Sequence, residues 1–411
     1  MDNILFAFFT ASIIMLLGFF GVLLFRKTSI PDVIFLIFLG ILIGPYAQLI
    51  NVSDIQPILP YMASLALAVL LFESGMRIDL DKILEKGRTL MTPSILSFAL
   101  SVIIITFFAR HALNFRWAYS LILAAIVGGS GSVTLMTLIR KMPLEEDALL
   151  ILTIELALTN VLSVIIALSC LEYIELSTPP SEVIVRLTSK FSTGIVAGFG
   201  IGVLWLLVVY FLREEEYFYM FTLSALIGVY SLAEFIGGSG ALASLIFGLV
   251  LGNDEKISSI LGLKIGVKEL RPIKELTRRF HSEITFLVRT FFFVLLGLNY
   301  ILDDPMEIIL GLSITAMLFA VRYVAITATT IHTALTKERK IISCAMGRGL
   351  AAAVLGIMPM EYGLKNANII LSIVVSVLLL SNIIMAIALS TIKEYRLWRK
   401  KVEADLKSNI K

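Results

Sequence analysis

The sequence predicts an all-α polytopic membrane protein with about thirteen transmembrane helices, arranged as inverted repeats that contain two broken, crossing helices. The chain of 411 residues is 58% hydrophobic and only 16% charged, and its mean hydropathy is +0.94. A soluble globular domain is closer to half apolar and a quarter charged. Apolar stretches of about 20 residues recur along the chain, which suits membrane-spanning helices, whereas the strands of a membrane barrel alternate over about ten residues.

Charge clusters and Gly, Pro, Asn and Asp residues divide the sequence into thirteen candidate spans. The first begins close to the N-terminus and is too long for the apolar region of a cleaved signal peptide. The ninth is short for a spanning helix. The spans lie near residues 4–25, 30–50, 58–76, 89–109, 116–139, 146–172, 189–212, 217–236, 238–252, 282–302, 307–331, 341–360 and 367–391.

The distribution of Lys and Arg predicts the orientation of these spans. Of the 34 basic residues, 26 fall on one side of the predicted membrane, five on the other and three inside spans. Because cytoplasmic loops carry the excess of Lys and Arg, we expect a cytoplasmic C-terminus and, with an odd number of spans, an N-terminus outside. The predicted location is the plasma membrane.

The stretch 253–281 is the only sizeable basic connector between predicted spans. Its apolar residues have the spacing of an amphipathic helix, which favours an interfacial helix that links two halves of a single membrane domain, 1–411. A surface for a regulatory ligand is the alternative.

Other functional classes find no support in the sequence. It contains no P-loop and no Gly-x-Ser-x-Gly motif, and its three histidines lie near span ends without ligand spacing. Both cysteines, Cys170 and Cys344, fall within apolar runs. We therefore expect no enzyme activity, no cofactor and no metal site. The formal charge of +3 is too small to predict a nucleic-acid partner.

Charged side chains within the predicted spans are the first indication of function. Each costs several kcal/mol at mid-bilayer, so such residues usually face an interior cavity. Acids and bases both occur, so internal ion pairing and direct transport chemistry are both open interpretations. These residues are Glu73, Glu155, Glu234, Arg289, Arg322 and Arg348.

Two predicted spans are interrupted by glycine-rich segments. One is Gly128-Gly129-Ser130-Gly131-Ser132 and the other is Gly347-Arg348-Gly349. Close helix packing through small residues is one interpretation. The other is a broken helix, because such segments are poor helix formers, and unwound backbone at membrane depth lines a cavity or is buried in protein. Transporters built from inverted repeats place such breaks at matching positions, here in the triples 89–172 and 307–391.

The stretch ELALTN, residues 155–160, lies in the span that follows the first break. Glu155 and Thr159 are four residues apart and share a helical face, while Asn160 is turned about 140° from Glu155. One of these helix faces can be directed toward the break, while the other contacts a different part of the protein.

Seven stretches carry a family resemblance: LLFESGMRIDL (70–80), the glycine-rich break at 128–132, ELALTN, GGSGALASLIFGLVLGN (237–253), TFFFVLLGLNY (290–300), VRY (321–323) and GRGLAAAVLGIMP (347–359). They resemble the monovalent cation:proton antiporters, in particular the NhaP-like sodium/proton antiporters, over nearly the whole chain. The resemblance implies a homodimeric secondary transporter with an elevator-like motion, whose substrates are a monovalent cation (Na⁺ or K⁺) and protons. It implies a transport bundle at about 89–172 and 307–391, and a dimerisation or scaffold part at about 1–76 and 189–302.

The resemblance also implies roles for three of the charged residues. The family pairs a glutamate of the sixth helix with an arginine of the late spans, and these match Glu155 and Arg322. Glu73 falls where the family has a glutamate near the ion.

The resemblance ends at the centre of the expected site. Asn160 occupies the position of the family's essential aspartate, and Thr159 that of the asparagine before it. Ser130-Gly131 stands in place of Thr-Asp, and Leu156 in place of a serine. Ion or substrate binding is therefore expected at Glu73, Ser130, Thr159 and Asn160. Neutral oxygens can still bind a cation, but Asn160 has no titrating group, which makes the ion site degenerate.

Three interpretations stay open at this point. The first is a cation/proton antiporter in which Glu73, and perhaps Glu155, supplies the charge and the titration. The second is a family member that moves a different solute, anionic or neutral, with Arg348 and the helix N-termini at the breaks favouring an anion. The third is a non-transporting relative or a variant with an altered site.

Overall fold

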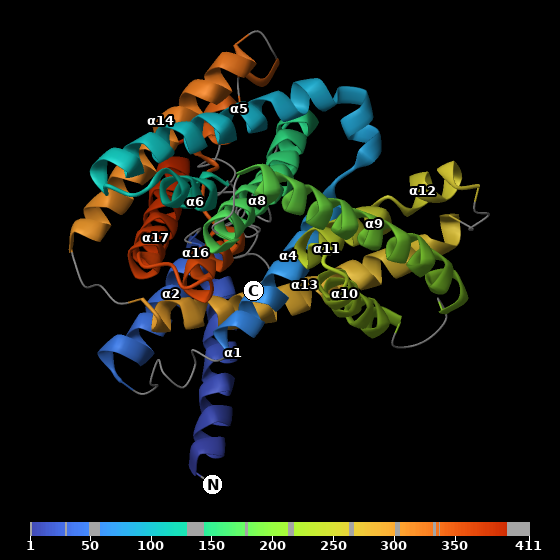
Figure 1. Ribbon diagram of the computed structural model, residues 1–411, viewed down its shortest axis with the longest axis horizontal. Helices are drawn as coiled ribbons and strands as arrows, with labels where there is room; N and C mark the ends of the chain where they lie inside the picture. The colour runs from blue at the N-terminus through green and yellow to red at the C-terminus, as the bar shows by residue number, and fades with distance from the viewer. Residues whose placement is uncertain are drawn as a thin grey trace, which may run out of the picture. The chain divides into compact units, whose positions relative to one another are not determined.

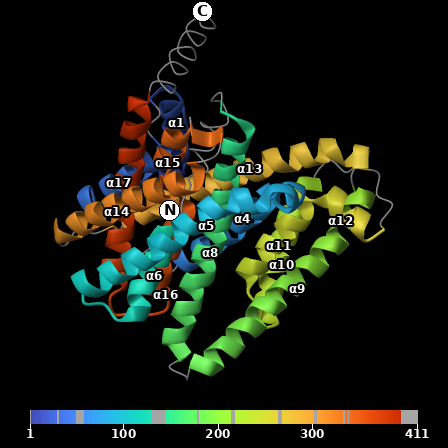
Figure 2. The same ribbon diagram turned by 90° about the horizontal axis from the view of Figure 1, so that it is seen from above.

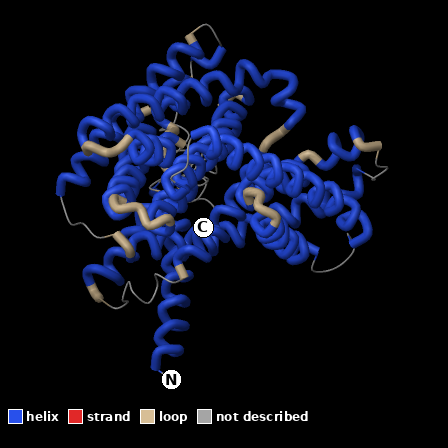
Figure 3. Tube along the Cα trace, in the orientation of Figure 1, coloured by secondary structure: helices blue, strands red, loops and turns tan. Residues whose placement is uncertain are grey.

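The protein is described here from a computed structural model, and every element within its described residues is helical (Figure 1, Figure 3). The described residues are 2–28, 31–48, 58–129, 144–176, 180–212, 218–262, 267–300, 305–331, 334–336 and 338–392.

The helices follow one another along the whole chain. In order they are α1 (Asp2–Thr28), α2 (Asp32–Ile41), η1 (Leu42–Tyr46), α4 (Leu59–Arg77), α5 (Leu80–Ala112), α6 (Trp117–Gly128), α8 (Glu146–Leu176), α9 (Pro180–Leu212), α10 (Phe218–Phe235), α11 (Gly240–Gly252), α12 (Asp254–Ile260), α13 (Val267–Leu298), α14 (Pro305–Thr330), η2 (Ala334–Thr336), α15 (Arg339–Cys344), α16 (Leu350–Glu361) and α17 (Ala367–Thr391).

Each span predicted from hydropathy contains helix within its described residues. By length and composition, six helices of the described residues can cross a membrane: Leu59–Arg77, Leu90–Ala112, Glu146–Glu175, Ser181–Val208, Pro305–Thr330 and Ala367–Thr391. Shorter apolar helices occupy six further predicted spans: Ser12–Leu23, Asp32–Tyr46, Trp117–Gly128, Met220–Phe235, Gly240–Gly252 and Leu350–Glu361. The remaining predicted span, 282–302, falls mainly in α13. The all-helical membrane fold is therefore confirmed.

The helix expected from residue 89 begins earlier, at Leu80. The carboxylate of Asp79 accepts hydrogen bonds from the main-chain N–H groups of Asp81 at 3.1 Å and Lys82 at 3.2 Å. The N–H of Leu80 donates to the Asn253 side chain at 2.9 Å. These bonds satisfy donors that the first turn of a helix leaves free, so the polar stretch before the apolar run is helical as well.

Helix also fills most of the predicted linker 253–281. It contains α12 and the first half of α13, which continues without interruption into the apolar stretch that ends at Leu298. The interfacial position of this linker stays a prediction.

The chain forms two compact units. The first comprises Met1–Pro60, Thr89–Ala167 and Thr290–Lys411, and the second comprises Tyr61–Arg88 and Leu168–Arg289. In the first unit α17 packs against α14, α16 and α6; in the second, α11 packs against α9 and α10 (Figure 1, Figure 2). The division into units does not test which part moves or dimerises, so the transport and dimerisation assignments remain predictions.

Two glycines of the second unit bring α4 and α11 into backbone contact. A Cβ atom on Gly75 would lie 2.1 Å from the Leu245 carbonyl oxygen, and one on Gly248 would lie 2.1 Å from the Phe72 carbonyl oxygen. Neither backbone oxygen can rotate away, so both positions require glycine. Close helix packing therefore explains these two glycines.

Candidate ion-translocation site

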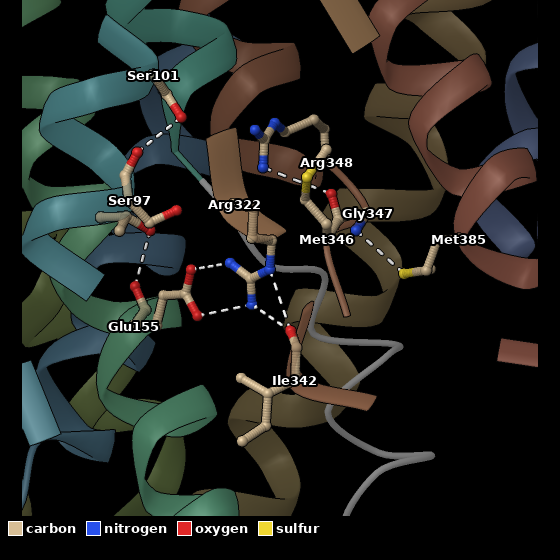
Figure 4. A network of polar contacts seen from close by, with 10 residues as sticks. Ser97, Ser101, Glu155, Arg322, Ile342, Met346, Gly347, Arg348 and Met385 are labelled. Carbon is tan, nitrogen blue, oxygen red and sulfur yellow. Dashed lines mark hydrogen bonds and ion pairs between the residues drawn. The ribbon is translucent and has the colours of Figure 1, made fainter. Parts of the chain in front are cut away.

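Glu155 of α8 and Arg322 of α14 form an ion pair in the first unit (Figure 4). Arg322 Nη2 donates to Glu155 Oε2 at 2.9 Å, and Nη1 donates to Oε1. Arg322 Nε and Nη2 also donate to the main-chain carbonyl of Ile342 at 3.1 and 2.9 Å. Both side chains are buried, with exposed fractions of 2% for Glu155 and 1% for Arg322. This bidentate geometry, with a further acceptor, is what a buried pair needs to offset the loss of hydration.

Polar side chains continue along α8 beyond Glu155. The hydroxyl of Thr159, which is buried, donates to the Glu155 carbonyl at 2.7 Å. Asn160 is also buried, with 5% of its surface exposed. Ser163 is buried, and its Oγ has no partner within the same part of the chain. This segment of α8 therefore offers neutral oxygens that its own helix does not fully use.

The first break begins where α6 ends, at Gly128. The next residue, Gly129, is extended, with φ −60° and ψ 134°. A Cβ atom on Gly129 would lie 2.4 Å from Ser163 Oγ and 3.4 Å from the Thr159 carbonyl oxygen, so this end of α6 touches α8 beside its polar residues. The predicted site residues Ser130 and Gly131 lie outside the described residues.

The second break separates α15 from α16, and side chains of α17 hold its backbone. The N–H of Gly347 donates to Met385 Sδ at 3.0 Å, and the N–H of Arg348 donates to Ser381 Oγ at 3.2 Å. Asn382 Nδ2 donates to the Arg348 carbonyl at 2.8 Å. The next residue, Gly349, is extended. Irregular backbone at membrane depth needs such partners, because lipid offers none.

The Arg348 side chain is buried beside this break. Its Nη1 lies 3.4 Å from the Met346 carbonyl, and its Nε has no partner among the described residues (Figure 4).

The predicted site residue Glu73 belongs to the second unit, whereas Thr159 and Asn160 belong to the first. Its Oε1 accepts a hydrogen bond from Arg77 Nη2 at 2.5 Å, one helical turn along α4. The two side chains are 13% and 17% exposed. The negative charge of Glu73 is therefore matched within its own helix.

Sequence reasoning missed residues that the structure places at the breaks. Ser163 is four residues beyond Thr159 and eight beyond Glu155, so helical periodicity alone could have drawn attention to it. The sequence indicated Ser381 and Asn382 less clearly. They are polar residues in the apolar run 367–391, but their hydrogen-bond partners lie more than 30 residues away in the sequence.

Comparisons with known proteins identify the family. The family described as sodium/hydrogen exchanger, transmembrane, matches residues 12–394. A "K(+)/H(+) antiporter NhaP2" of Shewanella sp. (strain ANA-3) is 25% identical over 375 residues, covering 89% of this chain and 62% of the relative. The "Na(+)/H(+) antiporter ApNhaP" of Aphanothece halophytica is 26% identical over 277 residues, covering 66% of this chain and 50% of the relative. The chain thus spans less than two thirds of the length of these curated relatives.

A solved structure shows the fold. The sodium proton antiporter MjNhaP1 of Methanocaldococcus jannaschii superimposes with a TM-score of 0.76 over 94% of this chain and 97% of that one, at 20% sequence identity. The described helices therefore adopt an MjNhaP1-like fold.

Proposed function

The chain belongs to the sodium/hydrogen exchanger family, whose members are transporters and not enzymes. We propose that it is a secondary transporter that exchanges a monovalent cation, Na⁺ or K⁺, for protons through a degenerate ion site. The observation that carries the proposal is the position of α8. Its Glu155 is held by Arg322, and its Thr159 and Ser163 lie against the extended end of α6.

Neutral oxygens would hold the cation in this proposal. We assign as ligands the side-chain oxygens of Asn160, Thr159, Ser163 and Ser130, together with main-chain carbonyls at the breaks. Carbonyl and hydroxyl oxygens replace the hydration shell of monovalent cations in other membrane proteins. The site would bind more weakly than one with a carboxylate, because it lacks a fixed negative charge.

Proton coupling requires a group that titrates, and Asn160 has none. Two carboxylates remain as candidates, Glu73 and Glu155, and each is matched by an arginine. Protonation of either carboxylate would release its arginine, so the proton would compete with an internal cation. We favour Glu73, because it and Arg77 are partly exposed, whereas the Glu155 pair is buried.

Transport by the purified chain in vesicles tests this proposal. Gradients of Na⁺, K⁺ or Li⁺ are imposed across the vesicle membrane, and a pH-sensitive dye reports proton movement between pH 5 and 9. We expect a signal that depends on the cation and is abolished in Glu73→Gln. The absence of any cation-dependent signal in the wild type would refute the proposal.

The assembly and topology form part of the same proposal. We expect a homodimer that moves the bundle of about 89–172 and 307–391 against the remainder, with the N-terminus outside and the C-terminus in the cytoplasm. Single cysteines near residue 2 and in the tail beyond residue 393 test the topology, because a membrane-impermeant thiol reagent added to intact cells should label only the first.

A second candidate is transport of a different solute. The loss of both family aspartates at Gly131 and Asn160 favours it, because a less anionic site no longer excludes neutral or anionic molecules. A solute screen by thermal stability separates the two candidates. Stabilisation that depends on the cation, measured at a constant chloride concentration, supports the antiporter.

A further inference from the structure

Arg348 carries a buried guanidinium that forms no ion pair with a carboxylate of the described residues. The side chain is 2% exposed. Its Nη1 donates to the Met346 carbonyl at 3.4 Å, which is long for a hydrogen bond, and its Nε has no partner in the described chain. The main-chain N–H and carbonyl of Arg348 are bonded to Ser381 and Asn382. The backbone at this residue is satisfied, whereas the charge is not.

The charges around Arg348 do not balance. Glu155 and Arg322 lie close enough to Arg348 to interact with its charge (Figure 4). Both oxygens of the Glu155 carboxylate accept hydrogen bonds from Arg322. Among the described residues, this buried group therefore contains one carboxylate and two guanidinium groups, which leaves one positive charge in excess.

A buried ion without a partner is unfavourable by several kcal/mol. Most groups avoid this by losing their charge, but a guanidinium stays protonated in proteins. The remaining way to balance the group is a counterion with lone pairs that can accept from the free N–H of Arg348.

The backbone beside Arg348 is closely packed. A Cβ atom on Gly347 would lie 2.4 Å from Asn382 Oδ1 and 2.8 Å from Met385 Cε, so α17 lies directly against the backbone beside Arg348. We propose that Arg348 binds a small inorganic anion, such as chloride, as a counterion in the interior of the first unit. This site goes beyond the proposed function, because it requires no particular transported solute.

Equilibrium binding of radiolabelled chloride to the purified full-length chain in detergent tests the proposal. We expect saturable binding of about one chloride per chain. We also expect chloride to raise the melting temperature relative to gluconate at the same Na⁺ concentration, by about 2 °C or more at saturation. Arg348→Met should lose both effects. Arg77→Met is the matched control, because Arg77 already has Glu73 as its partner and its replacement should leave chloride binding unchanged.

A charge series makes the test independent of any single variant. Arg322→Met frees Glu155 to neutralise Arg348, so chloride binding should weaken at least about tenfold although Arg348 is intact. Glu155→Gln leaves two unmatched guanidinium groups, so chloride affinity should rise. Only variants that elute as a single gel-filtration peak are compared, and Arg348→Gln, which also removes the charge, serves if Arg348→Met does not fold.

Unchanged chloride binding in Arg348→Met, or no saturable binding in the wild type, would overturn the proposal. Binding and exchange are measured separately, so the two proposals can fail independently. Cation-dependent proton movement without chloride binding would contradict only the proposal of an anion site. Chloride binding without cation-dependent proton movement would contradict only the proposal of an antiporter.

Discussion

Asn382 of α17 donates a hydrogen bond from Nδ2 to the main-chain carbonyl of Arg348 at 2.8 Å, and a second one to the Leu378 carbonyl of its own helix at 2.8 Å. A single buried amide thus joins an intact helix to the interrupted backbone between α15 and α16. The break has a defined shape because another helix supplies the donor that regular helix geometry would have supplied.

Asn382→Leu should destabilise the protein by about 1–3 kcal/mol, because the buried Arg348 carbonyl would lose its partner. Ser390→Ala on the same helix is the control. Its hydroxyl is exposed and bonds only to the Ile387 carbonyl nearby, so we expect an effect within about 0.5 kcal/mol. Denaturant unfolding in detergent measures both. Equal stabilities for the two variants would contradict the role assigned to Asn382.

Glu155→Gln should cost about 3–5 kcal/mol of unfolding free energy, because Arg322 then becomes a buried charge without a carboxylate. Arg322→Met should cost less, because Glu155 can then neutralise Arg348. The double variant Glu155→Gln with Arg322→Met should recover much of that loss. A double-mutant cycle reports the coupling energy. Additive single effects would show that the two side chains do not depend on each other.

Restoring carboxylates at the family's aspartate positions should increase cation-dependent proton movement. We expect the double change Gly131→Asp with Asn160→Asp to raise the initial rate at least about tenfold over the wild type, because a titrating group then competes with the cation. The pair Gly131→Asn with Asn160→Gln is the uncharged control. A rate equal to that control would show that the neutral site is not what limits exchange.

Gly248→Ala should destabilise the second unit by about 1–3 kcal/mol, because the new methyl group would lie 2.1 Å from the Phe72 carbonyl oxygen. Gly228→Ala on α10 should instead be neutral or stabilise by about 1 kcal/mol, because nothing lies within 4 Å of its Cβ position and alanine favours helix. Thermal unfolding compares the two. Similar losses at both positions would argue against the α4–α11 contact.

Glu338 should make the protein less stable as the pH rises. Burial raises the pKa of this carboxyl above 4.5, with a further increase from the nearby Glu145 carboxylate and an opposing decrease from the hydrogen bond donated by the Glu145 N–H at 2.7 Å. The folded state then holds the proton more tightly than the unfolded state. Stability is highest below pH 4.5 and falls until the pH passes the folded pKa.

Glu338→Gln removes this dependence while its side-chain oxygen can still accept from Glu145. Its melting temperature should match that of the wild type near pH 4 and exceed it at neutral pH. A constant difference between the two proteins from pH 4 to 8 would contradict the titration.

Hydropathy and glycine content, which are local properties of the sequence, were enough to predict much of the helical structure. The order of the apolar helices, the break after Gly128 and the break at 347–349 can all be read from the chain, because a helix must satisfy its own backbone in lipid wherever it lies. The helix boundaries were less accessible: α5 begins at Leu80 because Asp79 and Asn253 bond its first turn, and Asn253 is 173 residues away from Leu80.

Only the tertiary structure decided which polar groups satisfy one another. Residues 167 positions apart form the pair of Glu155 with Arg322, and the same arginine also bonds to the Ile342 carbonyl. Family resemblance named that pair, but composition and periodicity could not have selected Arg322 over Arg348. The two arginines have the same chemistry, and they differ in where the packing of α14 and the break places each guanidinium. Arg322 reaches the buried carboxylate, whereas Arg348 has no carboxylate partner within the described part of the chain.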